Sequence, residues 1–402
     1  MDSSVPFKTK AVFLFLIIFL LVENNPTRPK GKGYDYLFRL PDEVSFAPDI
    51  SCLIADLKYD GNGLKILEFG NITYSAFKGH KMLYGKSKVW EALWDELKSY
   101  NVPVWFISHP EDPLKQEERC FDRLSDIGIR YKGSTDLLLQ DDFFCDCLSS
   151  VVPDGGPKCI DDCKGVVVLK DRGWPINERS NYFIVLNRYI FKWANDKLKT
   201  SLLFGDNHLK NFKPRWKLYP KQFSDSLVKK IQEDFKEYDK LVIKPLHSTV
   251  GNGIIIFEKK DLEKIVKKIL VEKDTIDPND DPSYSHWLGD SEQAFLVESF
   301  EESKAIVVQN KRYDATMRVI FVLSCSGNKI GLKFLGSYWK LPKHSLDDDC
   351  GLQEKYKSKI VKGFVCSEKV SDEDITHVKE ILADVLPKMY LKVLQKEQVV
   401  GV

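Results

Sequence analysis

The sequence predicts a protein of mixed α/β and α+β class, in which a small α/β domain precedes two α+β subdomains. Strand-like apolar runs alternate with amphipathic helical segments between about residues 33 and 135, a pattern typical of a mostly parallel sheet. From about residue 181 the chain changes to a hairpin, charged helices and long β-branched runs. Its 402 residues are enough for two or three domains.

The composition is that of an ordinary globular protein, with 43% hydrophobic and 30% charged residues. The formal net charge is +1, and lysines are interspersed with acidic residues along the chain. A nucleic-acid-binding domain would show a strongly basic balance, so no nucleic-acid partner is expected.

Residues 1–25 form a segment of their own. Lysines precede an apolar run from Ala11 to Val22, and a polar stretch follows it. This is the order of a signal peptide, but the run is shorter than the about 20 residues that span a bilayer. A signal peptide, a marginal signal anchor and an uncleaved amphiphilic start are all open. We favour a targeting segment, which predicts membrane association or a secretory location; without a signal the chain would be cytoplasmic.

The α/β domain at 33–135 is predicted from alternating elements. Strands are expected at 50–57, 63–69 and 102–108, and helices at 87–100 and 114–128. A polar loop follows the second strand and offers Glu68, Asn71, Ser75 and His80 to a substrate, because loops at strand ends in such domains carry ligands. An ordinary connecting loop is the alternative.

Residues 136–180 form a cysteine-rich connector. Two disulfides are expected there if the chain is exported, whereas a zinc site and free thiols compete if it stays in the cytosol. The connector leads through the segment "GVVVLKD" at 165–171 into a helix at 181–198. Its cysteines are Cys145, Cys147, Cys159 and Cys163.

The rest of the chain divides into subdomains at 181–300 and 301–402. The first contains a helical stretch within 219–239, a hairpin at 239–261, a helix at 261–273 and a strand at 294–300. The second contains strands at 314–325 and 330–341 and a last helix at 371–394. That helix begins with a capping pattern at Ser371 and Asp374, and Pro387 is expected to kink it or to end its first half.

Lys244 stands inside the β-branched run of the hairpin "DKLVIKPLHSTVGNGIIIF". A strand lysine that points inward needs an anion, because an unpaired buried ammonium is very costly. The loop after it is rich in glycine, and such loops leave backbone N–H groups free to bind an anion. The alternative is a surface lysine beside a flexible hairpin loop.

Several features in a fixed order resemble the ATP-grasp family of carboxylate–amine ligases. They are the lysines of "NDKLK", the hairpin with Lys244, the apolar strand "FLVESF", and the strand that Asp314 and Arg318 open. The resemblance covers about Asn181 to Gly363 and implies an ATP-grasp-like fold after a small α/β pre-ATP-grasp domain. The hairpin also resembles that of tubulin tyrosine ligase-like enzymes.

The resemblance implies that the protein binds ATP and Mg²⁺, activates a carboxylate as an acyl phosphate, and joins it to an amine or thiol. A peptide or protein is one substrate class that fits this reaction. Arg318 would lie on the transferred phosphate, where a planar fork suits the developing charge. The nucleotide would be bound by Lys197 (with Lys199 as a competitor), by Lys244, by the lid residues Ser248, Thr249, Gly251, Asn252 and Gly253, and by the adenine-reading hinge Glu298, Ser299 and Phe300.

The metal ligands are where the sequence departs from the family, whose members hold Mg²⁺ with a carboxylate and a later Glu-x-Asn pair. No such pair follows the strand at 330–341, and the candidate ligands are Asp314, Asp347, Asp349 and Glu354. A run of charges is usually a solvated loop. A second function is therefore open: a catalytically degenerate nucleotide-binding protein, or a non-enzymatic binding protein on the same scaffold, membrane-associated or secreted.

Overall fold

The computed structural model describes residues 34–71, 79–80, 82–84, 88–99, 104–108, 130–134, 165–169, 183–194, 196–248, 251–277, 282–357 and 367–398. Helices combine with antiparallel and parallel sheets, as the sequence predicted. Within these ranges no helix is both long and apolar enough to cross a membrane. The N-terminal segment, the connector cysteines, the helix at 114–128, Ser75 and Thr249 lie outside the described residues, so their roles stay predictions.

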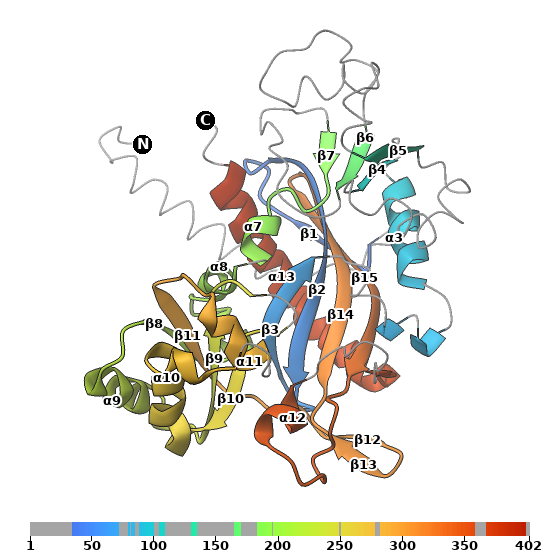
Figure 1. Cartoon of the computed structure of the whole chain (residues 1–402). Coiled ribbons are helices and arrows are strands. Elements are labelled where there is room, and N and C mark those ends of the chain that lie inside the picture. The colour runs from blue at the N-terminus through green and yellow to red at the C-terminus, as the bar shows by residue number, and fades with distance from the viewer. Residues whose placement is uncertain are drawn as a thin grey trace, which may run out of the picture.

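The centre of the molecule is an antiparallel sheet with strand order β1-β15-β14-β2-β3, hereafter the large sheet. Figure 1 shows its long strands side by side through the middle of the molecule. β16 pairs with β15 in addition. The strands are β1 (Tyr36–Arg39), β2 (Phe46–Tyr59), β3 (Leu64–Asn71), β14 (Thr316–Gly327), β15 (Lys329–Lys340) and β16 (Ser367–Glu368).

The two strands expected to open a separate α/β domain belong to the large sheet. β2 pairs with β14 in a register that runs from Leu57↔Met317 to Phe46↔Gly327. The first strands of the predicted domain at 33–135 therefore join strands of the predicted subdomain at 301–402. The difference has a physical reason: an apolar strand pairs with whichever strand offers a matching buried face, whatever the distance between them in sequence.

Side chains of the large sheet alternate between its two faces. Leu57 of β2 and Met317 of β14 point into the main core, which α13 completes. Asp56, Lys58 and Arg318 occupy the alternate positions and lie on the opposite face. The sheet therefore has one apolar face and, at this end, one charged face.

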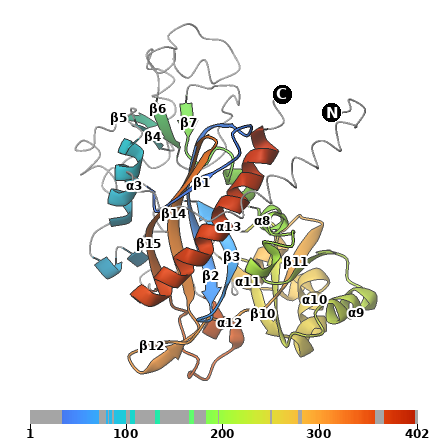
Figure 2. The same cartoon turned by 180° about the vertical axis from the view of Figure 1, so that it is seen from behind.

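The last helix, α13 (Asp372–Gln398), crosses the apolar face of the large sheet, as Figure 2 shows. Ser371 Oγ accepts a hydrogen bond from Asp374 N at 3.1 Å, so the predicted cap is confirmed. The helix continues through Pro387, contrary to the prediction that Pro387 could end its first half. Buried residues on both sides of Pro387, such as Leu382 and Tyr390, offset the one backbone hydrogen bond that proline removes.

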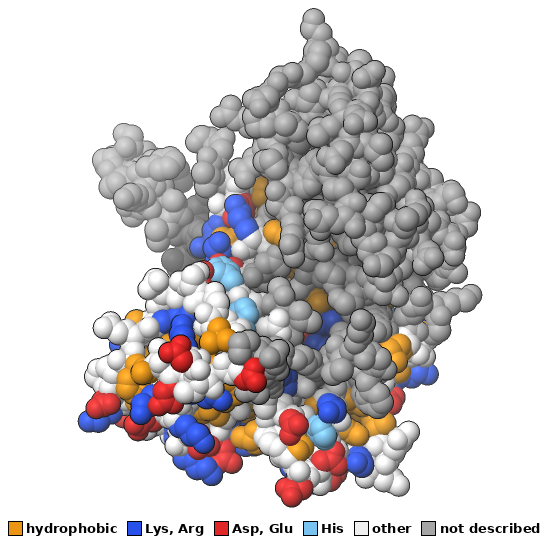
Figure 3. All heavy atoms as spheres, viewed as in Figure 1, with side chains coloured by type: hydrophobic (Ala, Val, Ile, Leu, Met, Phe, Trp, Pro, Cys, Tyr) orange, Lys and Arg blue, Asp and Glu red, His pale blue; other side chains and the backbone are white. Residues whose placement is uncertain are grey.

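A smaller antiparallel sheet with order β10-β9-β11-β8 carries α9 and α10 on one side. The predicted hairpin is confirmed by the β9–β10 pairing, and Ser224 Oγ caps α9 by accepting from Leu227 N at 3.1 Å. On the face drawn in Figure 3, positive and negative side chains are mixed over this part of the molecule. The elements are β8 (Trp216–Pro220), α9 (Asp225–Asp234), β9 (Lys240–Pro245), β10 (Ile255–Glu258), α10 (Leu262–Leu270) and β11 (Ala294–Ser299).

A parallel sheet with order β5-β4-β6-β7 accounts for the α/β character of the predicted domain and connector. The predicted single helix at 181–198 is replaced by a strand and two short helices, because the chain at 183–185 pairs with β6. Asn187, with a φ of 63°, turns the chain after that strand. The elements are β4 (Val104–Ser108), β5 (Arg130–Ser134), β6 (Gly165–Leu169), β7 (Phe183–Val185), α7 (Phe191–Ala194) and α8 (Lys197–Leu203).

The other described elements connect or cover these sheets. They are α3 (Lys88–Ser99), α11 (Pro282–Ser285), β12 (Ile306–Val308), β13 (Lys311–Tyr313) and α12 (Leu352–Tyr356), with short 3-10 turns at Lys210–Phe212, Lys259–Asp261, Lys273–Thr275 and His286–Leu288.

Asp49 of β2 lies beneath α13 and is 1% exposed. Tyr390 of α13 donates a hydrogen bond to it, and Ser51 Oγ donates another at 3.1 Å. Burial raises the pKa of Asp49 from 3.8 to about 6, against the lowering effects of Tyr390, Ser51 and Arg188. A raised folded-state pKa means that the fold loses stability as the pH rises from about 4 to about 6.

We therefore expect Asp49→Asn to stabilise the fold at pH 8 by up to about 3 kcal/mol and to change it little at pH 4.5. Asparagine keeps an acceptor for Tyr390 and has no charge to bury. Melting curves of both proteins at the two pH values measure this, and an equal difference at both would contradict it.

Candidate functional site

Lys244 lies on the face of the small sheet that is turned away from α9 and α10. Leu241 and Ile243 pack into the core under those helices, so the alternation of β9 places Lys244 on the other face. Lys244 pairs with Leu296 in the register, which brings Glu298 of β11 diagonally opposite. Lys244 Nζ donates to Glu298 Oε2 at 2.5 Å. The inward lysine predicted from the sequence is therefore present, with a carboxylate beside it.

Lys213, which sequence analysis did not select, is the second ammonium group at Glu298. Its Nζ lies 3.3 Å from Glu298 Oε1 and donates to the carbonyl oxygen of Leu67 in β3 at 2.6 Å. One side chain thus joins the small sheet to the large sheet. Burial lowers the pKa of Lys213 to about 8, an effect that Glu298 partly offsets. In the sequence it is only a lysine before a proline, which does not indicate a site.

Lys197 at the start of α8 supplies the third ammonium group. Its Nζ donates to the carbonyl oxygen of Ser248 at 2.6 Å and to Ser248 Oγ at 2.7 Å, which ties α8 to the loop after β9. Burial lowers the pKa of Lys197. Lys199 is 47% exposed at its side chain and pairs with Asp196 at 3.5 Å, so Lys197 and not Lys199 joins this group.

The glycine-rich loop between β9 and β10 needs its glycines. Gly251 and Gly253 have φ values of 73° and 71°, where any other side chain is strained. A Cβ on Gly253 would lie 2.6 Å from Pro245 Cγ and 2.7 Å from His286 Cδ2. Trp287 Nε1 donates to the carbonyl oxygen of Gly253 at 3.0 Å. The loop is therefore fixed against the end of the strand that carries Lys244, and the predicted lid residue Asn252 is half-buried within it.

Two ammonium groups share one buried carboxylate at this site, and a third, that of Lys197, bonds Ser248. Lys213, Lys244 and Glu298 are 3%, 7% and 2% exposed. Burial would raise the pKa of Glu298, but Lys213 and Lys244 outweigh it and lower that pKa, so the carboxylate is ionised. Glu298 Oε1 is a buried atom without a hydrogen-bond partner in the described part of the chain. Because uncompensated buried charge is costly, the excess of positive charge is suited to an anion.

A second charged group lies on the polar face of the large sheet. Arg318 of β14 holds Asp56 of β2 by a fork, with Nε–Oδ1 and Nη2–Oδ2 distances of 2.7 Å each. Lys340 of β15 donates to the same carboxylate at 2.7 Å. Burial would raise the pKa of Asp56, but Arg318 and Lys340 hold it well below its usual value. Asp56 is a charged residue inside the apolar run of β2. A charge inside an apolar strand is also the signal that indicated Lys244, so Asp56 could have been found from the sequence.

Glu68 of β3 links the two charged groups. It pairs with Asp56 in the register and is half-buried. The loop prediction selected Glu68, although as part of another domain. Its carboxylate acts to raise the pKa of cations in both charged groups, namely Lys197, Lys213, Arg318 and Lys340.

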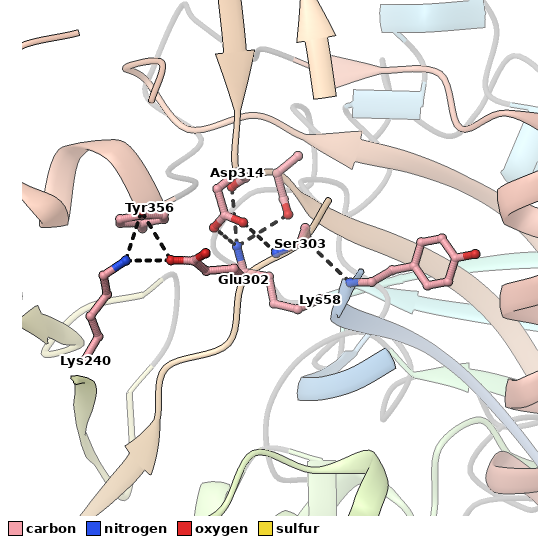
Figure 4. A network of polar contacts seen from close by, with 8 residues as sticks. Lys58, Lys240, Glu302, Ser303, Asp314 and Tyr356 are labelled. Atoms are coloured by element: carbon pink, nitrogen blue, oxygen red, sulfur yellow. Dashed lines mark hydrogen bonds and ion pairs between the residues drawn. The ribbon is translucent and has the colours of Figure 1, made fainter. Parts of the chain in front are cut away.

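Asp314, predicted as a metal ligand, is a structural partner instead. Lys58 of β2 pairs with Asp314 Oδ2, and Ser303 N donates to Asp314 Oδ1 at 2.6 Å, as Figure 4 shows. Burial raises the pKa of Asp314, and Lys58 opposes that rise. Both oxygens are engaged, and they tie the segment after β11 to the large sheet.

The other predicted metal ligands do not meet. Asp347 is exposed and binds Arg312 at 2.7 Å, Asp349 is exposed, and Glu354 Oε2 accepts from Gly351 N at 3.3 Å. Among the residues that the structure describes, no three His, Cys, Asp or Glu side chains could hold one metal ion. These four residues therefore do not converge on one point in the described structure, because acidic side chains in a loop reach water and neighbouring cations at little cost.

The predicted adenine-reading hinge has its backbone donors occupied. Ser299 N donates to the carbonyl oxygen of Arg215 at 2.8 Å, and Phe300 N donates to that of Lys240 at 3.2 Å. These N–H groups are engaged within the protein, so they are not available to an adenine edge. At this segment it is the side chain of Glu298, and not the hinge backbone, that faces the site.

His80, predicted to face a substrate, is buried against β15. It is 6% exposed, and its Nε2 lies 2.9 Å from the position of a Cβ on Gly336. Burial lowers the pKa of His80 to about 4, and Lys88 contributes in the same direction, so the ring is neutral near pH 7. Only a glycine at 336 leaves room for this ring.

No protein-family model matches the sequence, and no curated protein matches it. The chain is similar to solved structures of three synthetases. A gamma-glutamylcysteine synthetase-like protein from Methylobacillus flagellatus KT is 10% identical, covers 88% of this chain and 91% of its own, and has a TM-score of 0.45. D-cycloserine synthetase DcsG is 11% identical over 72% and 82% of the two chains, with a TM-score of 0.39. D-alanyl-alanine synthetase A from Vibrio cholerae is 10% identical over 72% and 81%, with a TM-score of 0.38.

Glu298→Gln should destabilise the protein by about 3–5 kcal/mol in a buffer without multivalent anions, because it leaves the buried lysines without their carboxylate. Inorganic triphosphate should then raise the melting temperature of the variant more than that of the wild type. Glu263→Gln, on the exposed side of α10, is the control. A variant with the melting temperature of the wild type, which triphosphate does not raise, would show that the lysines are not an anion site.

Proposed function

We propose that this protein is an ATP-dependent ligase that activates a carboxylate as an acyl phosphate and joins it to an amine or thiol. The observation that carries the proposal is the excess of ammonium groups at the buried Lys213 and Lys244 and the half-buried Lys197, next to Gly251 and Gly253. The order of motifs that resembles ATP-grasp ligases supports the same proposal.

A nucleoside triphosphate fits the residues of the small sheet. Its phosphates would neutralise the lysines that Glu298 leaves in excess. On the same face Leu218 is 44% exposed, which suits the apolar face of a base, whereas Val242 and Leu296 beside the charged pair are buried.

The described residues contain no group of three His, Cys, Asp or Glu side chains that could bind a magnesium ion. Asp56 and Glu68 are the carboxylates nearest the charged groups, but Asp56 is already held by Arg318 and Lys340.

The reaction would proceed between the two charged groups. A carboxylate oxygen attacks the γ-phosphorus of ATP, and ADP leaves with the electrons of the broken bond. Arg318 and Lys340 lie on the polar face of the large sheet and would stabilise the charge on the acyl phosphate. An amine then attacks the acyl carbon, phosphate leaves, and an amide results. Such catalysis rests on positioning and charge neutralisation.

The second candidate function is nucleotide binding without catalysis. The absence of three metal ligands from the described ranges favours it. Both candidates require ATP to bind, and turnover distinguishes them. A targeting role of residues 1–25 stays part of either proposal.

Lys244→Met is expected to weaken ATP binding at least about tenfold, because it removes one charge–phosphate contact. The fold should survive, since Lys213 still neutralises Glu298. Calorimetric titration with ATP and a melting curve measure both effects. Lys260→Met, fully exposed, is the matched control. Wild-type protein that does not bind ATP would refute the proposed function.

Lys340→Met should lower kcat by about 10²–10³ while the Kd for ATP stays within about twofold. The reason is that Lys340 would stabilise charge that develops on the transferred phosphate only in the transition state. The fork between Arg318 and Asp56 remains, so the sheet is preserved. ADP release is measured against paired carboxylates and amines, including peptides, and Lys343→Met is an exposed control. Equal losses in both variants would contradict the assignment of Lys340.

A further inference from the structure

The short helix α12 lies in the segment after β15 but makes its contacts on the small sheet. Gln353 of α12 reaches β10, where its Oε1 accepts from Ile256 N at 2.7 Å and its Nε2 donates to the carbonyl oxygen of Ile254 at 2.6 Å. Nε2 also donates to Ser283 Oγ at 2.7 Å. One side-chain amide therefore makes three hydrogen bonds across a sequence separation of 70 to 99 residues.

These bonds fall on the open edge of the small sheet. β10 is the first strand in the order β10-β9-β11-β8, so one side of its backbone has no neighbouring strand. The N–H of Ile256 and the C=O of Ile254 are on that side, and the amide of Gln353 satisfies both as a further strand would. An edge without such a partner is free to fray or shift.

The other end of α12 contacts the beginning of β9 and the segment after β11. Tyr356 OH lies 3.3 Å from Lys240 Nζ and donates to Glu302 Oε1 at 3.4 Å, and its ring packs edge-on against Phe300 at 4.7 Å. Figure 4 shows Lys240, Glu302 and Tyr356 converging on one another. α12 therefore joins β10, β9 and the β11 connector at once.

The glycine-rich loop leads directly into the strand that Gln353 holds. Gly253 is followed by Ile254, whose carbonyl oxygen Gln353 binds. Lys357, one residue beyond α12, places its Cε 3.4 Å from the Cβ position of Gly251. The position of the loop over Lys244 thus depends on where α12 holds the edge of β10.

We infer that Gln353 is a positioning residue of the nucleotide site, which fixes the edge of β10 and with it the glycine-rich loop beside Lys244. This inference rests on the proposed function. It gives α12 a role that is separate from the charges that bind phosphate: Gln353 touches no nucleotide and acts through the backbone of Ile254 and Ile256.

The test compares Gln353→Leu, Gln353→Glu and the control Lys355→Ala. Lys355 lies on the same helix, and its Nζ donates to the carbonyl oxygen of Leu346. Leucine removes all three bonds of Gln353, whereas glutamate keeps an acceptor for Ile256 N. In each protein we would measure ATP affinity by calorimetry, KM for ATP and kcat, and amide exchange of Ile256 without ligand, with Ile243 of β9 as the internal reference.

Gln353→Leu should raise the Kd and KM for ATP about tenfold at unchanged kcat, as expected when one side chain leaves two backbone groups unpaired. Ile256 should exchange at least about tenfold faster and Ile243 at the same rate. Gln353→Glu should fall between the leucine variant and the wild type, and Lys355→Ala should match the wild type.

Two results would overturn the inference while the proposed function stands: ATP affinity in Gln353→Leu equal to wild type, or Ile256 exchange unaffected by the change. A wild-type protein that binds no nucleotide would overturn the proposed function and the nucleotide role of Gln353 together. Exchange at Ile256 would then still decide whether Gln353 fixes β10.

Discussion

Two ammonium groups held around one buried carboxylate are the constraint on which the rest of this structure depends. Lys213 must reach both Glu298 and the carbonyl oxygen of Leu67, so the distance between the small and large sheets is set by the length of one lysine side chain. Lys197 in turn must reach Ser248, which fixes α8 against the loop after β9. The charged side chains of the site therefore also hold the two sheets and α8 together.

The large sheet repeats the same arrangement with different residues. Arg318 and Lys340 share Asp56, just as the lysines of the small sheet share Glu298. Glu298 and Asp56 each have two cations as partners. The positive charge that remains is not cancelled by Glu68 alone. A ligand with several negative charges would therefore stabilise the contact between the sheets as well as bind to it.

Local features of this chain could be predicted from sequence because their causes are local. The alternation that turns Lys244 away from Leu241 and Ile243 is a property of β9 alone, and Ser371 caps α13 with its own neighbours. The partner of β2 could not be predicted, since the pairing of strands depends on distant faces. The arrangement of the acidic run near Asp347 could not be predicted, because composition does not say whether carboxylates meet at one point or each pair with a separate cation.

The large sheet also sets the order of events during synthesis. β2 is made early, but its partner Arg318 follows Asp56 by 262 residues. At about 5–20 residues per second, roughly 13–50 s pass before β14 is available to β2. For that time a 14-residue strand that is almost entirely buried in the finished protein can pair only with β3. The hairpin of β2 and β3 is therefore the part of the nascent chain whose apolar surface is exposed longest and on which a chaperone would act.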